Sequence, residues 1–511
     1  MVIGDHSRFA ASSIVRFPPR LGGKLLELLF LLVAALFLFV DPIVPPVALA
    51  DESRNANNAI DMHLGGFSLI TTYDFRPDLW NTKPPLLIWL MSATMALFGP
   101  SEWALRLPSA LAAMGTLWMV LLLVRRVTGS TGTALLAASL LLLSPGFFGE
   151  HGARTGDYDA LLTLFVTAAL VLLFFTLHRR RPRVRSLMII GSLVGLAAMT
   201  KSVAAFIPLV GVFPYAIALR RWPRMFISWP SYALAVALGI GPLLLFVLLR
   251  ESMAPGYVDA ILFNDITGRF ANALVSEETG PLYYVEDLLK GWFFAGPFLL
   301  AFPLVFRHLS GRSRLLAIYS AAISLTTLSI YSAAATRAIQ YALPVMPWLA
   351  IAAALTLRHL VTGYVRAPWQ AGRRAQASLI ALGLSLVTAQ LTSRAVYWRT
   401  EGFPARQFYP QASYGDVFAM LAGRGVLDFV VVEPGYTHLG VPGYAPLFRW
   451  NRLVWMERGL RIDRALTIAT HPGRVQASCV PDVIRQWHGQ PLEFVSGCAI
   501  RWPAQLAAPR S

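Results

Sequence analysis

Two charged motifs near the start of the chain combine residue types that suit chemistry on an anionic substrate. Asp51 and Glu52 are adjacent, and Lys83 follows in the same polar stretch, directly before two prolines. A carboxylate can take a proton from an attacking hydroxyl, and two carboxylates can hold a divalent metal. A lysine on a proline-stiffened backbone can hold a phosphate. An Asp-Glu pair can equally cap a helix, and the sequence leaves these interpretations open.

A second acidic motif, Asp157-Tyr158-Asp159, opens a long apolar run three residues after Arg154. Two carboxylates at this spacing suit a sugar's hydroxyls or a metal, and an arginine can form paired hydrogen bonds to phosphate. A helix cap with a salt bridge would use the same residues. No cofactor is required by this chemistry, although Asp51 and Asp157 could bind a divalent metal. Further polar candidates stand near the ends of other apolar runs: Arg54, Lys201, Arg269, Arg337 and Tyr341.

The elements that must position these residues are membrane helices. Of the 511 residues, 56% are hydrophobic and only 14% are charged, which is too little polar surface for a soluble body of this size. The net charge of +17 comes from short basic clusters between apolar runs, a pattern typical of cytoplasmic loops. We therefore predict an α-helical integral membrane protein and exclude nucleic acid as a partner.

About eleven apolar runs approach the length needed to cross a bilayer. They cover residues 25–40, 101–124, 131–149, 159–177, 186–200, 202–219, 228–249, 288–306, 315–332, 341–357 and 376–391. Basic clusters follow every second run, so all of them can be cytoplasmic. This requires the short run 84–98 to be an interfacial or re-entrant helix, and it places a turn at Thr200-Lys201-Ser202. Gly191 and Gly195, four residues apart, predict close helix packing.

With this orientation, the candidate residues all fall on the side opposite the basic clusters. Ionisable residues at a membrane are costly unless they pair with one another or line a cavity. We therefore predict a single polar site on the outer side.

The sequence predicts two domains. Residues 1–392 form a polytopic transmembrane domain whose first outer loop is 41–100, and residues 393–511 form a small periplasmic α/β domain. In the second domain the apolar runs are short, as in Phe429–Val432, and turn residues separate them. Cys479 and Cys498 suit one disulfide, or two unpaired thiols. Ala48-Leu49-Ala50 resembles a signal cleavage site, but the long apolar core favours a retained first span.

An ordered set of motifs resembles the bacterial membrane glycosyltransferases of the GT-C fold. The motifs are Ala50–Arg54, Lys83–Leu86, Phe98–Ala110, Ala153–Leu162, Met199–Lys201, Asn264–Phe270, Gly280–Tyr284 and Arg337–Pro344. The likeness covers residues 20–360. More specifically, the motifs resemble those of the aminoarabinose lipid A transferases and the protein O-mannosyltransferases.

This resemblance implies an inverting glycosyltransferase of the bacterial inner membrane that moves a sugar from a polyprenyl-phosphate donor to lipid A, lipopolysaccharide core or another envelope acceptor, on the periplasmic side. It implies that Asp51 is the catalytic carboxylate, with Glu52 and Asp159 as further catalytic candidates, and that Lys83 contacts the donor phosphate. The remaining residues would bind the donor: Arg54, Arg154, Asp157, Lys201, Arg269, Arg337 and Tyr341. Asn81-Thr82 stand where the aminoarabinose transferases tend to have an aromatic residue and a glutamate, which puts a metal site built on that glutamate in doubt.

Other classes of protein remain open. A protein O-glycosyltransferase would share this fold. A secondary transporter or flippase would also be polytopic, but its ionisable residues usually lie near the bilayer midplane on broken helices, often within inverted repeats. Here the charges lie at the predicted ends of spans and no repeat is visible. A non-catalytic assembly protein is a further alternative.

Overall fold

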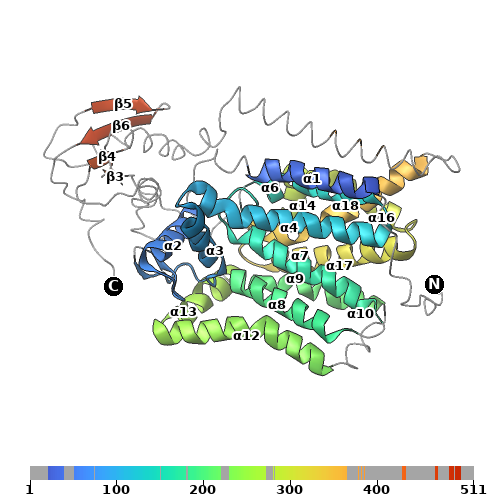
Figure 1. Cartoon of the computed structure of the whole chain (residues 1–511), viewed down its shortest axis with the longest axis horizontal. Helices are drawn as coiled ribbons and strands as arrows, with labels where there is room; N and C mark the ends of the chain where they lie inside the picture. Colours follow the sequence, from blue (N-terminus) through green and yellow to red (C-terminus); the bar gives the residue numbers. More distant parts are fainter. Residues whose placement is uncertain are drawn as a thin grey trace. The chain divides into compact units, whose positions relative to one another are not determined.

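The computed structural model (Figure 1) describes residues 21–39, 51–73, 75–149, 151–179, 182–219, 229–271 and 282–364, four later strands, and the single residues 280, 378, 381 and 385. The chain divides into two compact units. The large unit comprises residues 1–41, 78–87 and 108–394, and the small unit comprises residues 42–77, 88–107 and 395–511.

The large unit is helical throughout its described residues. Its elements are α1 (Leu21–Phe39), α4 (Glu102–Thr128, from Pro108 on), α5 (Thr131–Leu142), α6 (Pro145–Phe148), α7 (Tyr158–Leu177), α8 (Val184–Lys201), η2 (Ser202–Ala205), α9 (Ile207–Val210), α10 (Val212–Ala218), α12 (Trp229–Met253), α13 (Tyr257–Ile261), η3 (Leu262–Ala271), α14 (Tyr283–Asp287), η4 (Leu288–Trp292), α15 (Gly296–Leu299), α16 (Phe302–Phe306), α17 (Gly311–Ala333), η5 (Ile339–Val345) and α18 (Met346–Tyr364).

Seven stretches of the described chain are long and apolar enough to cross a membrane. They are Gly22–Phe39, Glu102–Thr128, Tyr158–Leu177, Val184–Ala205, Trp229–Met253, Gly311–Ala333 and Ile339–Val361. Each contains most or all of one predicted span. The mostly helical membrane architecture predicted from composition is therefore confirmed.

Three other predicted spans, 131–149, 202–219 and 288–306, appear as shorter or broken helices. Proline at the start of a helix is favourable but inside one it is disruptive, and new helices begin around Pro145 and Pro208. Within 288–306, Gly291 has a φ of 122°, a backbone conformation that ends regular helix. The last predicted span, 376–391, falls largely outside the described residues.

The segment predicted not to cross the membrane forms α3 (Leu86–Phe98), a helix of 13 residues. A helix of this length rises about 20 Å, which is shorter than the roughly 30 Å of bilayer hydrocarbon. The helix length agrees with the prediction of an interfacial or re-entrant segment.

Helices α7, α8 and α12 pack side by side, with α8 between the other two (Figure 1). Gly191 and Gly195 bring α8 into backbone contact with α12, because a Cβ atom at either position would collide with the carbonyl oxygen of Ala235 or Leu238. The predicted packing role of these glycines is confirmed.

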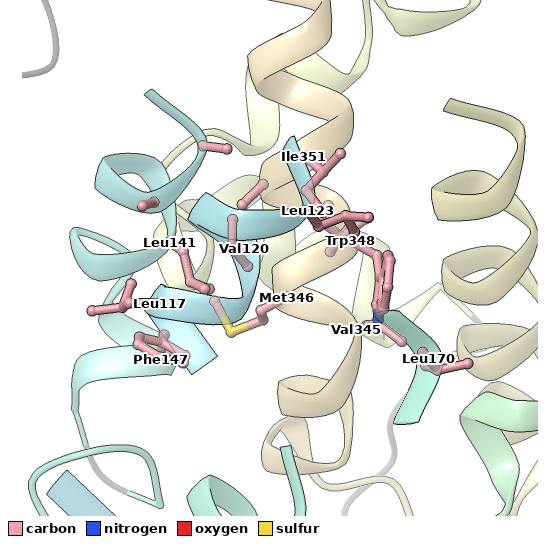
Figure 2. Packing of buried hydrophobic residues seen from close by; sticks show 14 of the residues in the cluster. Leu117, Val120, Leu123, Leu141, Phe147, Leu170, Val345, Met346, Trp348 and Ile351 are labelled. Atoms are coloured by element: carbon pink, nitrogen blue, oxygen red, sulfur yellow. The ribbon is translucent and has the colours of Figure 1, made fainter. Parts of the chain in front are cut away.

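The core of the large unit joins helices that are far apart in the sequence. Figure 2 shows Leu117 and Val120 of α4, Leu141 of α5, Phe147 of α6 and Leu170 of α7 around Met346, Trp348 and Ile351 of α18. Trp348 is fully buried. This packing joins α7 and α18 to α4, α5 and α6.

The described part of the small unit contains α2 (Asp51–Gly65), the short antiparallel strands β1 (Thr72–Tyr73) and β2 (Arg76–Pro77), most of α3 and the first residues of α4. Strands β3 (Phe429–Val432), β4 (Leu466–Ala469), β5 (Val483–Trp487) and β6 (Gln490–Val495) form one sheet in the order β3-β4-β6-β5. Strands β3 and β4 are parallel, and the other pairs are antiparallel. The short apolar run Phe429–Val432 forms β3. Ala48–Ala50, Cys479 and Cys498 lie outside the described residues.

Candidate active site

Lys83 lies in a tightly hydrogen-bonded loop, residues 78–85, here called the Lys83 loop. The Asp78 carboxylate accepts hydrogen bonds from the backbone N–H groups of Trp80 (3.0 Å) and Asn81 (3.1 Å). The N–H of Thr82 donates to the carbonyl of Trp80. Asp78, Asn81 and Thr82 are buried, whereas Lys83 is only half-buried. The loop therefore presents Lys83 from a fixed backbone.

A side-chain contact ties the Lys83 loop to the second acidic motif. Asn81 Nδ2 donates to the hydroxyl of Tyr158 over 3.0 Å, across 77 residues of sequence. Tyr158 is the first residue of α7, with Asp157 at the N-cap and Asp159 next to it. Since Lys83 is two residues from Asn81, their Cα atoms are at most about 7 Å apart. The structure thus brings Lys83 and the Asp157–Asp159 motif into one neighbourhood.

Asp159 forms an ion pair with Lys201 at the end of α8. Lys201 Nζ lies 2.5 Å from Asp159 Oδ1, and the two side chains are 11% and 5% exposed. Lys201 Nζ also lies 5.3 Å from the centre of the Tyr341 ring, within the range of a cation–π contact. Three predicted site residues, from α7, α8 and η5, therefore meet.

The predicted turn after Lys201 is also present. Ser202 has φ 48°, a left-handed conformation that is unusual for a residue other than glycine, and the chain leaves α8 there. This turn fixes where α8 ends and so where the ammonium group of Lys201 begins to project.

Asp157 is buried among hydrogen-bond donors. Thr155 Oγ1 donates to its carboxylate over 2.6 Å, and His151 Nδ1 lies 3.3 Å from Asp157 Oδ2. Burial raises the pKa of Asp157, but the charge and hydrogen bond of His151, the hydrogen bond of Thr155 and the charge of Lys201 together bring this pKa below its ordinary value. His151 itself has a left-handed φ of 58°. Asp157 is therefore held as a carboxylate.

The structure describes side-chain contacts for two of the three remaining predicted arginines of the large unit. Arg337 is half-buried and its Nε donates to the carbonyl of Ser332 over 3.0 Å. The guanidinium of Arg154 lies 5.0 Å from the centre of the Phe148 ring. Arg269 falls within η3, but its side chain lies outside the described part of the structure.

In the small unit, Asp51 and Glu52 open α2 but have different surroundings. Asp51 is exposed at the start of the helix. Both carboxylate oxygens of Glu52 are bound by Arg106, whose Nε and second terminal nitrogen lie 2.6 Å and 2.9 Å away. This pair is fully buried, at 1% and 0% exposure. Its geometry fits a structural role for Glu52 better than the predicted catalytic one.

The rest of α2 is polar yet buried, and its side chains bind the hairpin that follows. Asn58 Nδ2 donates to the carbonyl of Thr72 over 2.6 Å, and the N–H of Phe75 donates to Asp61 over 2.8 Å. The guanidinium of Arg54 lies 5.2 Å from the Tyr73 ring centre. Because buried polar groups need partners, these bonds stabilise α2 as a rigid support for Asp51.

Within the described ranges, no three or more His, Cys, Asp or Glu side chains group together in a way that could hold a metal. A metal at Asp51 or Asp157 stays a prediction. Sequence analysis missed Asn81 and Tyr158, because nothing in the local sequence marks a contact made 77 residues away. It also missed Thr155, whose contact with Asp157 is only two residues away in the sequence.

Two of the basic clusters begin at helix ends that are far along the chain from Asp159. Ser109 of α4 donates to the carbonyl of Asp157, and Arg125-Arg126 follow about 24 Å further along that helix. Helix α7 runs about 27 Å from Asp159 to its end, where Arg179 follows. The arrangement agrees with a site on one side of the membrane and basic loops on the other.

Chemically, the large unit contains charged side chains that can bind an anion. Lys201 and the half-buried Lys83 can neutralise a phosphate, and Asp159 orients Lys201 by direct pairing. The Tyr341 ring lies beside Lys201, and the Tyr331 ring packs against it with ring centres 5.3 Å apart.

Comparisons with known proteins identify a family, several relatives and a solved structure that this chain is similar to. Residues 82–246 match the family model described as dolichyl-phosphate-mannose-protein mannosyltransferase. The undecaprenyl phosphate-alpha-4-amino-4-deoxy-L-arabinose arabinosyl transferase of Shewanella sediminis is 28% identical over 311 residues, covering 59% of this chain and 54% of that protein. Its counterpart in Aeromonas salmonicida is 28% identical over 458 residues, covering 86% and 78%. Against several relatives the chain spans about half of the relative's length or less.

Among solved structures, the crystal structure of ArnT from Cupriavidus metallidurans bound to undecaprenyl phosphate superposes with a TM-score of 0.66. The two chains are 16% identical, and the match covers 95% of this chain and 99% of that one. At this identity the match shows a shared fold. The resemblance to GT-C fold, polyprenyl-phosphate-sugar glycosyltransferases, stated from the motifs, is confirmed.

Proposed function

We propose that the protein is an inverting glycosyltransferase that moves a sugar from a polyprenyl-phosphate donor to lipid A or another acceptor of the cell envelope. The observation that carries this proposal is the junction of the Lys83 loop with α7 and α8. There Asn81 contacts Tyr158, and Asp159 holds Lys201. The family match and the named transferase relatives support the same activity.

In this reaction an oxygen of the acceptor attacks the anomeric carbon, and the bond from that carbon to the phosphate oxygen breaks. The polyprenyl phosphate leaves with the electron pair, so negative charge grows on its oxygens. Lys83 and Lys201 would stabilise this charge, which is the largest task in such a displacement. Because Asp159 fixes the direction of Lys201, little reorganisation would be needed when the charge forms.

The group that accepts the proton of the acceptor depends on the kind of acceptor. If the acceptor is a hydroxyl, we assign its proton to Asp51, which rests on the resemblance of the Ala50–Arg54 motif. If the acceptor is a phosphate of lipid A, no base is needed, and Asp51 would then orient the acceptor.

The topology belongs to the same proposal. We place the site on the periplasmic side of the inner membrane, with the basic clusters in the cytoplasm, because of the positive-inside rule. About eleven spans and a periplasmic domain over residues 393–511 complete this arrangement.

A protein acceptor is the second candidate, because the family model that matches residues 82–246 is described as a protein mannosyltransferase. The two candidates differ only in the molecule that receives the sugar. Arg337, Tyr341, Arg154 and Arg269 would serve the donor in either case.

Mass spectrometry of lipid A and of envelope glycoproteins from a strain that lacks the gene tests both candidates. We expect one sugar to disappear, and to return with the wild-type gene but not with Lys83→Ala or Asp51→Asn. The class of molecule that loses the sugar names the acceptor. An unchanged set of lipids and glycoproteins, or full restoration by Lys83→Ala, would reject the proposed function.

A further inference from the structure

Thr82, the residue before Lys83, is held from two sides by the segment that follows α12. Its hydroxyl donates to Asp265 Oδ2 over 2.7 Å, and its carbonyl accepts from the hydroxyl of Tyr257 over 2.7 Å. Thr82 is 1% exposed. These contacts join parts of the chain 183 and 175 residues apart.

The support for Tyr257 is itself rigid. The guanidinium of Arg250 lies 5.0 Å from the centre of the Tyr257 ring, and Phe246 meets the ring at its edge. Burial raises the pKa of Tyr257 above its ordinary value, so its hydroxyl stays protonated and can donate. The Tyr257 side chain is therefore buried and packed against both neighbours.

The turn that leads into Tyr257 is also held. The Glu251 carboxylate accepts from the N–H groups of Gly256 (2.9 Å) and Val258 (2.8 Å), one on each side of Tyr257. Gly256 has φ 97°, which glycine adopts without strain. The hydrogen bonds of this turn therefore fix the backbone on both sides of Tyr257, whose hydroxyl binds the Thr82 carbonyl.

The carbonyl that Tyr257 binds belongs to the peptide unit joining Thr82 to Lys83. A peptide unit is planar, so a hydrogen bond to its oxygen helps to fix the orientation of the plane that contains the Lys83 N and Cα atoms. Pro84 follows Lys83 and restricts its ψ angle. The peptide plane before Lys83 is thus restrained by a contact from α13, and the ψ angle of Lys83 is restrained by the sequence itself.

We propose that Tyr257 and Asp265 are positioning residues for Lys83: through Thr82 they hold its ammonium group where a polyprenyl phosphate binds. This inference rests on the proposed function, because it assigns Lys83 to the phosphate. Tyr257 and Asp265 act through the loop, and neither is assigned a contact with the substrate.

The test measures the affinity of the purified full-length protein for undecaprenyl phosphate in lipid nanodiscs. Tyr257→Phe removes only the hydroxyl and keeps the ring against Arg250, and Thr82→Val removes the other hydroxyl at nearly constant shape. Each should weaken binding about 3- to 10-fold, the usual weight of one hydrogen bond. Thr82→Ser, which keeps the donor, should stay within about twofold of the wild type.

Tyr319→Phe is the matched control. The Tyr319 hydroxyl donates to the carbonyl of Leu170 over 2.8 Å and is buried, so the same atom and the same kind of bond are lost elsewhere in the large unit. Its loss should lower thermal stability about as much as the loss of the Tyr257 hydroxyl and leave the affinity unchanged.

A double variant separates positioning from general destabilisation. If Tyr257 acts through Lys83, adding Tyr257→Phe to Lys83→Ala should weaken binding no further. A further loss of about the same factor in that background would overturn the inference, as would wild-type affinity in both Tyr257→Phe and Thr82→Val. A wild-type protein that does not bind the lipid, or a Lys83→Ala variant that binds normally, would instead reject the proposed function and the inference with it.

Discussion

Among the described residues, the Glu52–Arg106 pair of the small unit and the Asp159–Lys201 pair of the large unit are both buried, but they differ in how many hydrogen bonds the partners share and in how exposed they are. Glu52 and Arg106 satisfy each other through two parallel hydrogen bonds and are shielded from water. Asp159 and Lys201 share one short contact, and Lys201 keeps 11% of its side chain exposed beside an aromatic ring. Lysine carries three donors, so a single carboxylate oxygen leaves it capacity for another anion.

The difference teaches that a buried charge in this membrane protein is not by itself a sign of chemistry. Arg106 binds both carboxylate oxygens of Glu52, whereas Asp159 contacts Lys201 through one oxygen and the ammonium group has further donors. On this basis we assign a structural role to the Glu52–Arg106 pair and propose that the Asp159–Lys201 pair belongs to the site.

The largest effect on stability should come from opening the closed pair. Arg106→Ala leaves the Glu52 carboxylate buried without its partner, which costs about 3–5 kcal/mol of folding free energy. Thermal unfolding in detergent measures the loss. Removing both charges with Glu52→Leu and Arg106→Met should recover much of it, because two apolar side chains need no partner.

That double variant also tests whether the Glu52–Arg106 pair has only a structural role. If it folds as stably as the wild type but no longer transfers sugar, Glu52 takes part in the chemistry and the division between scaffold and site is wrong.

Opening the site pair should reduce activity more than stability. Lys201→Ala removes one cation from the developing phosphate charge and should slow transfer about 100- to 1,000-fold. Because water reaches this pair, the loss of stability should be smaller than for Arg106→Ala. Lys290→Ala is the matched control, since Lys290 pairs with Glu286 at 68% and 55% exposure outside the site, and its rate should match the wild type. A Lys201→Ala enzyme with normal turnover would remove Lys201 from the site.

A smaller effect should follow from moving α8 without touching its charge. Gly191→Ala places a methyl group against the Ala235 carbonyl, so α8 and α12 must separate, at about 1–3 kcal/mol. Gly241→Ala, on α12 where a Cβ atom meets nothing within 4 Å, should not destabilise. Thermal midpoints of the two variants provide the comparison. Equal midpoints would show that the close contact of α8 and α12 is not needed for stability.

The smallest effect should appear as a pH dependence. The pKa of Asp157 is lower in the folded protein than the unfolded value of about 3.9. Its contribution to stability is therefore fully present above about pH 4 and is lost as the pH falls through the lower folded pKa. Midpoints measured from about pH 5 down to about pH 2 should fall less steeply for Asp157→Asn than for the wild type. Parallel curves would show that Asp157 contributes nothing to the acid response.

Much of the architecture could be predicted from the sequence, because long uninterrupted apolar runs such as 159–177 and 228–249 have few alternatives in a membrane. Among the runs that proved broken, 288–306 contains Gly291. The sequence alone does not predict whether a glycine in a membrane segment adopts a left-handed conformation.

The candidate site could be predicted only in part. Lys83, Asp159 and Lys201 are visible in the sequence because charges are rare beside apolar runs. The partners that hold them, Asn81 with Tyr158 and Thr82 with Asp265, are ordinary polar residues whose contacts depend on the fold. Glu52 was predicted to be catalytic because it is a carboxylate next to Asp51. Only the fold shows that its partner is Arg106, 54 residues away in the sequence.

An experimental structure of the protein with undecaprenyl phosphate bound tests the central claim most directly. The account predicts that the phosphate oxygens lie within hydrogen-bonding distance, about 2.7–3.2 Å, of both the Lys83 and the Lys201 ammonium groups. A phosphate bound elsewhere, with Lys201 contacting only Asp159, would contradict it.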